Sequence, residues 1–297
     1  MSFDNTRPSD FSADLPNALR AAIKAGDLAR VQALLPRWRA FTAPDMRSLL
    51  YDAVCHSRIP LISYLLSQEP GLAKSFSAAA SCQFSSDVLQ VFLDHGWDIN
   101  EDDIKRGTAL HRAVGQDNLS LVTWLLNRGA DPNAAHNGST PSSFRIMYGI
   151  AKGNTVLDTA ARRCTPDTID FLRQRGAQLE RSNALHAAAS GFRSGGDDQS
   201  RISMIEHLLN LGMDIDAIEF DNNDELRERF GAQRTLGTPL HYAVRGGMPH
   251  RVRLLLERGA DREIMATHNT GTALDWAKRL DAEYEYSQEV VDLLSYQ

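Results

Sequence analysis

The stretch from Gly237 to Asp261 constrains the fold of this chain more than any other. Thr238 is suited to cap a helix, and Pro239 fits the first helical position, where no amide hydrogen is needed. Apolar residues at helical spacing then mark two short helices: Leu240, Ala243 and Val244, followed by Val252, Leu255 and Leu256. Gly246 and Gly247 separate these helices. The stretch therefore predicts a hairpin of two helices with one apolar side, which is too small to bury that side alone.

The same register of apolar residues recurs along the chain. Hairpin units open near residues 17, 48, 75, 108, 155, 183, 238 and 272, after a polar tail (1–16) that we expect to be disordered. The units at 108, 183 and 272 open with the strings TALHRAV, NALHAAA and TALDWAK, whereas the first three units have no such string. Because each hairpin needs neighbours to cover its apolar side, the recurrence predicts a single domain of stacked units over 17–297.

These units resemble ankyrin repeats, whose signature is a T-P-L-H-x-A helix start in a unit of roughly 33 residues. The resemblance covers about residues 17–297 and is strongest in the unit that opens at 238. It implies an all-α solenoid of helix–turn–helix units joined by β-hairpin fingers, with the first helices lining a concave groove. It also implies a non-catalytic protein–protein interaction module that acts as an adaptor, scaffold or inhibitor.

Two connections between units are longer than the period requires. Most steps between unit starts lie between 27 and 34 residues, but the step from 108 is 47 and the step from 183 is 55. The extra residues predict two enlarged fingers, 134–153 and 219–236, beside the fifth and sixth units, and a longer loop at 192–200. The fingers carry apolar residues suited to a partner surface or to a pocket wall: Phe144, Ile146, Met147, Tyr148, Phe220 and Phe230.

Arginine and aromatic residues recur at the fifth and eighth positions of the later first helices, which should face the groove. They are Arg112, Arg162, Tyr242, Arg245, Trp276 and Arg279, with Arg163 beside Arg162. Guanidinium groups pair with carboxylates and phosphates, and aromatic rings supply apolar anchors. The pattern favours a groove that binds an acidic protein or an anionic small ligand. A solvated basic face without a partner is the alternative.

The fourth position of the unit carries a recurring titratable residue, His111, His186 and His241 in three units and Asp158 in the fifth. The resemblance implies that the histidines hydrogen-bond between neighbouring units. A shared metal site is disfavoured, because stacked helices lie roughly 8–10 Å apart and zinc–nitrogen bonds are about 2.0–2.1 Å long. If the chain is instead an enzyme or a pocket protein, an acid–base site between the fingers would use His136, Tyr148, Asp158 and Arg162.

Composition narrows the function classes further. The 297 residues carry a formal charge of −6, which argues against a general nucleic-acid binder, and the three cysteines have no CxxC spacing. No signal-peptide pattern opens the chain, and no apolar run approaches the roughly 20 residues that span a bilayer. We therefore expect no cofactor, no metal, no nucleic acid and no membrane partner. A cytoplasmic location is favoured, with the nucleus open, and the oligomeric state is undetermined.

Overall fold

The computed structural model describes residues 15–38, 42–75, 85–102, 107–136, 154–191, 198–221, 224, 227–228, 235–284 and 288–295. These residues form an all-α structure, as predicted. Among them, β-structure is limited to isolated bridges such as the antiparallel bridge between Ala135 and Thr155. The chain divides into two compact regions, Met1–Glu101 and Asp102–Gln297. A single array over 17–297 therefore stays a prediction.

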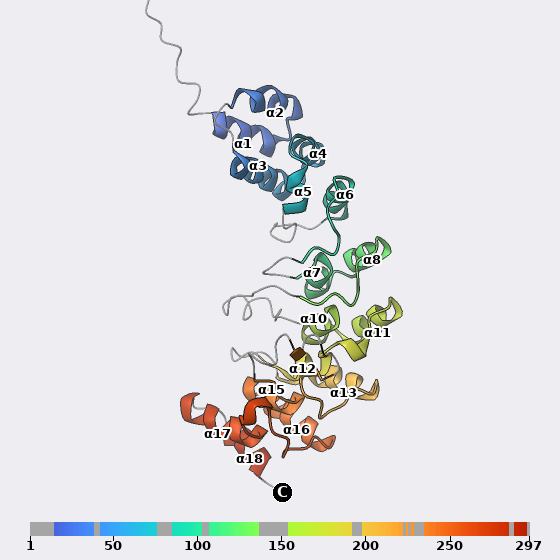
Figure 1. Ribbon diagram of the computed structural model, residues 1–297, viewed down its shortest axis with the longest axis vertical. Helices are drawn as coiled ribbons and strands as arrows, with labels where there is room; N and C mark the ends of the chain where they lie inside the picture. Colours follow the sequence, from blue (N-terminus) through green and yellow to red (C-terminus); the bar gives the residue numbers. More distant parts are fainter. Residues whose placement is uncertain are drawn as a thin grey trace, which may run out of the picture. The chain divides into compact units, whose positions relative to one another are not determined.

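The first region consists of short helices in successive pairs (Figure 1). They are α1 (Leu15–Ala25), α2 (Leu28–Leu34), η1 (Leu35–Arg37), α3 (Ala43–Cys55), α4 (Ile59–Gln68), α5 (Gly71–Ser75) and α6 (Ser86–Asp94). Helix α1 packs on α2 and α3, α3 packs on α4, and α4 contacts α6. The apolar stripes of these helices are buried, including Leu19, Ile23, Leu50, Ile62, Leu65 and Phe92. The helices are thus amphipathic elements that become stable by covering one another.

Two unit starts in the first region differ from the sequence prediction. Helix α1 begins at Leu15, inside the predicted tail, and α3 begins at Ala43, so that the predicted start at Ser48 lies within a helix. The cause is a capping box that the apolar register does not reveal. The backbone amide of Thr42 donates to the Asp45 carboxylate at 3.0 Å, and this contact begins the helix more than a turn earlier.

The second region repeats the helix pair five times among the residues that the structure describes (Figure 1). The pairs are α7 (Ala109–Gly115) with α8 (Leu119–Asn127), α10 (Val156–Arg163) with α11 (Pro166–Gln174), α12 (Ala184–Ala189) with α13 (Ile202–Asn210), α15 (Pro239–Gly246) with α16 (Pro249–Glu257), and α17 (Ala273–Tyr284) with α18 (Gln288–Ser295). Short 3-10 helices lie between pairs at η3 (Leu179–Arg181) and η5 (Thr267–Asn269), and η4 (Asp198–Arg201) directly precedes α13. The first helices contact one another in order, α7, α10, α12, α15 and α17.

Local sequence explains where the first helices of this region begin and end. Thr108, Thr155 and Thr238 are the N-cap residues of α7, α10 and α15. The hydroxyls of Thr108 and Thr155 each accept the backbone amide three residues later, which satisfies one of the free amides of the first turn. At the other end of α15, Gly247 has φ of +66°, a left-handed conformation in which a side chain would be strained.

The sixth and seventh units fit together unusually closely. Gly191 follows the end of α12, and a Cβ atom there would lie 1.9 Å from the Met248 methyl group. A Cβ atom on Gly246 would in turn lie 2.7 Å from the Gly191 amide nitrogen. The absence of side chains at both positions therefore allows the backbone of one unit to approach the next.

Candidate functional site: the first-helix face of the second region

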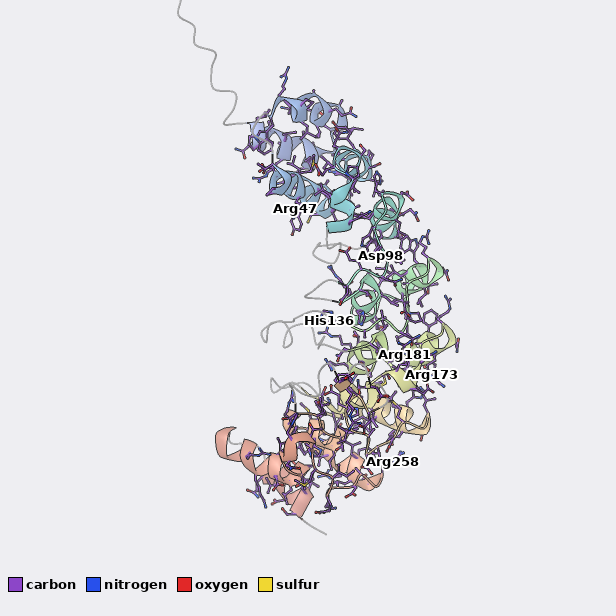
Figure 2. The ribbon with its side chains drawn as sticks, in the orientation of Figure 1. Arg47, Asp98, His136, Arg173, Arg181 and Arg258 are labelled. Atoms are coloured by element: carbon purple, nitrogen blue, oxygen red, sulfur yellow. The ribbon has the colours of Figure 1, made fainter. Side chains whose placement is uncertain are left out.

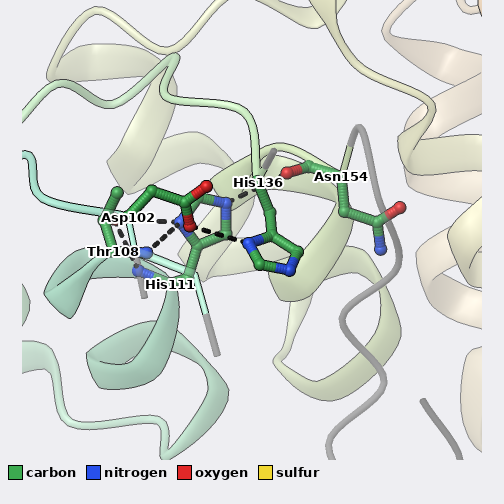
Figure 3. Close-up of polar contacts among 5 residues, drawn as sticks. All are labelled: Asp102, Thr108, His111, His136 and Asn154. Carbon is green, nitrogen blue, oxygen red and sulfur yellow. Dashed lines mark hydrogen bonds and ion pairs between the residues drawn. The ribbon is translucent and has the colours of Figure 1, made fainter. Parts of the chain in front are cut away.

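The histidine of the fourth unit links that unit to the fifth (Figure 3). The backbone amide of Thr108 donates to His111 Nδ1 at 3.3 Å, so the other ring nitrogen, Nε2, carries the proton and donates to the Asn154 carbonyl at 3.1 Å. Burial lowers the pKa of His111 to about 4, although the Asn154 carbonyl opposes this shift. The ring is therefore neutral at pH 7 and acts as a structural bridge.

The two other histidines also bridge units through Nε2. His241 Nδ1 accepts the Thr238 amide at 3.2 Å, and its Nε2 donates to the Gly271 carbonyl at 3.3 Å. His186 Nε2 donates to the Ala217 carbonyl at 2.9 Å. Each ring thus ties its helix to the connection that follows, as the resemblance implies. Among the residues that the structure describes, no cluster of side chains is arranged to hold a metal ion.

Asp158 takes the place of the histidine in the fifth unit with the opposite hydrogen-bond polarity. One carboxylate oxygen accepts the Thr155 amide and the other accepts the Asn183 amide of the next unit, both at 2.7 Å. The side chain is fully buried, and this burial raises its pKa to about 7 against the opposing effects of those amides and of Arg162. Asp158 therefore bridges two units and has no surface open to a substrate.

His136 is also a structural residue in this geometry (Figure 3). Its ring is fully buried, with Nδ1 2.7 Å from an Asp102 carboxylate oxygen, and its backbone amide donates to the Asn154 carbonyl at 2.9 Å. These contacts fix the base of the first finger. Of the residues expected in an acid–base site, His136 and Asp158 are thus both closed to solvent, and Tyr148 lies outside the described residues.

The groove arginines lie on contacting helices. Arg112 on α7 and Arg162 on α10 are half-buried, and Arg163 on α10 is exposed. The stem of Arg163 passes close to α7, because its Cδ is 3.9 Å from the position of a Cβ atom on Gly115. The arginine-bearing face of α10 therefore lies at van der Waals distance from α7 at this point.

The aromatic residues expected in the groove are buried instead, which corrects their predicted role as open contacts. Tyr242 is 7% exposed and Trp276 is 8% exposed. The Trp276 ring meets His241 edge-on with centroids 4.9 Å apart. The Tyr242 hydroxyl donates to the carboxylate of Glu219, a buried residue whose role the sequence did not reveal. Both rings therefore belong to the packing between units.

The exposed side chain at the surface of α15 is Arg245. Its guanidinium lies over the Tyr242 ring, 5.3 Å from the centroid, and no carboxylate among the described residues pairs with it. Arg279 on α17 is exposed as well, but it donates to the backbone carbonyls of Thr270 and Asp275 in its own unit. Of these two arginines, Arg245 is thus the one oriented by a ring and open to a new anion.

Phe220, expected as a finger contact, is only 1% exposed and belongs to the core, which is a second correction. Its ring packs with Leu236, and the partly buried Ala135 and Ile218 lie against them. The other predicted finger contacts, Phe144, Ile146, Met147, Tyr148 and Phe230, lie outside the described residues. What the structure describes of both fingers is therefore their bases.

A hollow of about 190 Å³ lies apart from the groove arginines. It is bounded by the connection that follows α11 and by the one that follows α13, and Arg173 and Arg181 contribute to its lining. Figure 2 shows these two arginines near α11, on the side of the second helices. Acidic residues, including Glu180 and Asp214, line it too, so the hollow has no single charge.

Comparison with known proteins agrees with this architecture. A family model of three ankyrin repeats matches residues 74–136, and a model of the single ankyrin repeat matches residues 237–267. The chain contains ankyrin repeats in both matched segments. The matched segments include the units whose histidines, His111 and His241, bridge neighbouring ankyrin repeats in the structure.

Several relatives share ankyrin repeats with this chain. The chain is 37% identical over 81 residues to an ankyrin repeat and LEM domain-containing protein 1 homolog of Caenorhabditis elegans, which covers 27% of the chain and 11% of that relative. It is 27% identical over 153 residues to human ankyrin repeat and SOCS box protein 6, which covers 52% of the chain and 32% of the relative. The alignments thus span a third or less of the length of these relatives.

Within the described residues, no helix has the length and apolarity to cross a membrane.

Proposed function

We propose that the chain is a non-catalytic interaction protein that binds an anionic segment of another protein on the first-helix face and the two fingers. Ankyrin repeats are protein–protein interaction modules, and the repeats matched at 74–136 and 237–267 support this class of function. The partner would meet Arg245 and the arginines of α7 and α10 on one side. Its apolar residues would meet the first finger, whose sequence contains Phe144, Ile146 and Met147.

One observation carries the choice of an anionic partner. Arg245 is exposed, its guanidinium lies over the Tyr242 ring, and no described carboxylate neutralises it. A stacked arginine loses less conformational freedom on binding than a free one, and its outer edge remains available for a carboxylate. A small anionic ligand would meet the same groups, so the experiment must separate the two.

A catalytic function has less support. An acid–base site needs groups within hydrogen-bond reach of a substrate. His136 and Asp158 are both fully buried and occupied by hydrogen bonds to protein groups. We therefore assign them to the stability of the repeats.

The test compares binding of a fluorescent oligo-glutamate peptide and of free glutamate to the intact chain. We expect the peptide to bind, to weaken as salt rises, and to lose about tenfold in affinity in Arg245→Ala, because a charged hydrogen bond is lost. Arg253→Ala is the matched control, since Arg253 is an exposed arginine that pairs with Glu289 on α18. Equal affinities of the two variants for the peptide would show that Arg245 is not part of the site. Free glutamate that binds as tightly as the peptide would favour a small ligand over a protein partner.

Mass spectrometry of proteins retained by the wild-type chain but not by Arg245→Ala would then identify the natural partner. A protein retained equally by both variants binds elsewhere on the chain.

A further inference from the structure

The base of the second finger is held by several contacts at once. The Glu219 amide donates to the Gly237 carbonyl at 3.1 Å, and the Phe220 amide donates to the Asn183 side-chain oxygen at 2.8 Å. Phe220 has φ of +68°, a left-handed conformation that is uncommon for a bulky side chain. Such a conformation persists only where the surroundings determine it, so this turn has one well-defined arrangement.

The base of the first finger reaches the same place. Ala135 packs against the cluster of Phe220 and Leu236, although 84 residues of sequence lie between Ala135 and Phe220. On its other side, Ala135 pairs with Thr155, and His136 is fixed by Asp102. The two finger bases are therefore in contact across the short connection of the fifth unit, which contributes the Asn183 side chain.

A second set of contacts joins this place to the first-helix face. Glu219 precedes Phe220, and its buried carboxylate accepts the hydroxyl of Tyr242 on α15. The Tyr242 ring meets His186 of the sixth unit edge-on, with centroids 5.6 Å apart, and lies beneath the Arg245 guanidinium. The position of the ring that supports Arg245 is thus set by the base of the second finger.

We propose that Glu219 and Tyr242 are positioning residues that join the bases of both fingers to Arg245, so that the orientation in which Arg245 meets a partner depends on contacts at those bases. This inference rests on the proposed function, because it assigns how that binding site is held together. The contacts run from Ala135 to Phe220, through Glu219 to Tyr242, and then to Arg245. We therefore expect a change at the base of a finger to alter the binding affinity at Arg245, with a coupling free energy of ordinary size for two linked sites.

A purely stabilising role is the alternative, since buried hydrogen bonds and apolar clusters also stabilise repeats that bind nothing there. The two roles predict different effects of a conservative substitution on residues that it does not contact. Tyr242→Phe keeps the ring beneath Arg245 and removes only the hydrogen bond to Glu219. Ala135→Gly removes only the methyl group that touches the second finger.

Amide hydrogen exchange of the intact chain tests the joint without any ligand. In Ala135→Gly, we expect the Phe220 and Leu236 amides to exchange roughly fivefold faster, the lower end of ordinary coupling between sites. Ala134→Gly is the matched control, because it makes the same change at the neighbouring residue of the finger, outside the cluster. Identical exchange at Phe220 and Leu236 in both variants would show that the finger bases are independent.

A binding cycle with the oligo-glutamate peptide tests the link to the groove. We expect Tyr242→Phe to weaken binding roughly fivefold in the wild-type background and to have no effect in the Arg245→Ala background, because it acts through that arginine. Tyr64→Phe, in the first region, controls for the loss of a hydroxyl. An equal loss in both backgrounds, or no loss while the wild type binds, would overturn the positioning role. If the wild type itself does not bind the peptide, the proposed function fails, and the exchange experiment still decides whether the fingers are joined.

Discussion

Asp158 accepts a hydrogen bond from the backbone amide of Asn183, where the equivalent histidines of other repeats donate to a backbone carbonyl. The direction of the link between repeats is therefore reversed between the fifth and the sixth. The replacement is possible because both partners change. In the fifth repeat a carboxylate acceptor faces a backbone amide, whereas in the other repeats an imidazole N–H donor faces a backbone carbonyl. A histidine at this position is consequently not equivalent to the aspartate.

Asp158→Asn should destabilise the second region by about 2 kcal/mol, because an amide offers one acceptor oxygen to two backbone donors and buries a competing donor. Urea unfolding at pH 8, above the raised pKa of Asp158, measures the loss. Asp275→Asn is the matched control, since Asp275 makes the same contact with the Thr272 amide at an exposed position. We expect a smaller loss there, and equal losses would contradict the importance of burial.

Acidification should reveal the buried state of His111. Its folded pKa of about 4 lies below the unfolded value of 6.5, so its contribution is complete above pH 6.5 and is lost as the pH falls through 4. The lost contribution amounts to about 3 kcal/mol. Asp158 acts in the opposite direction, because its folded pKa of about 7 exceeds the unfolded value of 3.8, so that folding is favoured as the pH falls from 7.

The His111 effect is therefore measured as a difference between the wild type and His111→Gln, which cannot take up the proton. The stability advantage of the wild type should shrink between pH 7 and pH 4, while the Asp158 contribution cancels. A difference that is constant over this range would show that His111 titrates alike in the folded and unfolded chain.

Arg251→Met should cost about 3 kcal/mol, because the variant leaves buried carbonyl groups without a donor. Arg251 is 4% exposed and donates to the carbonyls of Ala188 at 3.0 Å and Ser190 at 2.7 Å, where α12 ends. Arg253→Met on the same helix should change stability by less than about 1 kcal/mol, since its ion pair with Glu289 is exposed. Thermal and urea unfolding distinguish the pair, and similar effects would argue against a capping role for Arg251.

Shortening the first finger should separate binding from stability. The His136 amide donates to the Asn154 carbonyl at 2.9 Å, so a two-residue Asn-Gly turn in place of residues 137–153 joins ends that are already paired. We expect the melting temperature to change by less than about 3 °C, corresponding to about 1 kcal/mol, and binding of the natural partner to be lost. Removing residues 192–197 from the sixth repeat is the control. Full binding by the shortened protein would place the partner elsewhere.

Local chemistry made most of the fold predictable. The threonines at 108, 155 and 238 occupy N-cap positions, because a cap-forming residue and the apolar spacing of the helix coincide within one turn. The start of α3 was missed because its signal, a capping box of Thr42 and Asp45, precedes the apolar register. Local patterns are thus sufficient where several of them coincide.

The candidate site was less predictable, since its decisive contacts are long-range. The position of Tyr242 in the repeat indicates a groove residue, but Glu219 from the second finger covers its hydroxyl. Phe220 looked like a surface anchor because its finger is an insertion, and only the packing of Leu236 and Ala135 shows that it is core. No spacing rule links residues that meet through an insertion of variable length.

The contact of Gly191 and Gly246 with Met248 limits how freely this protein can be rebuilt. In a repeat array each repeat contacts only its neighbours, so a single repeat can often be replaced by a consensus copy. Here, a side chain at either glycine would occupy the space of the facing repeat. The sixth and seventh repeats therefore have to be exchanged together, as one unit of two repeats, or left in place.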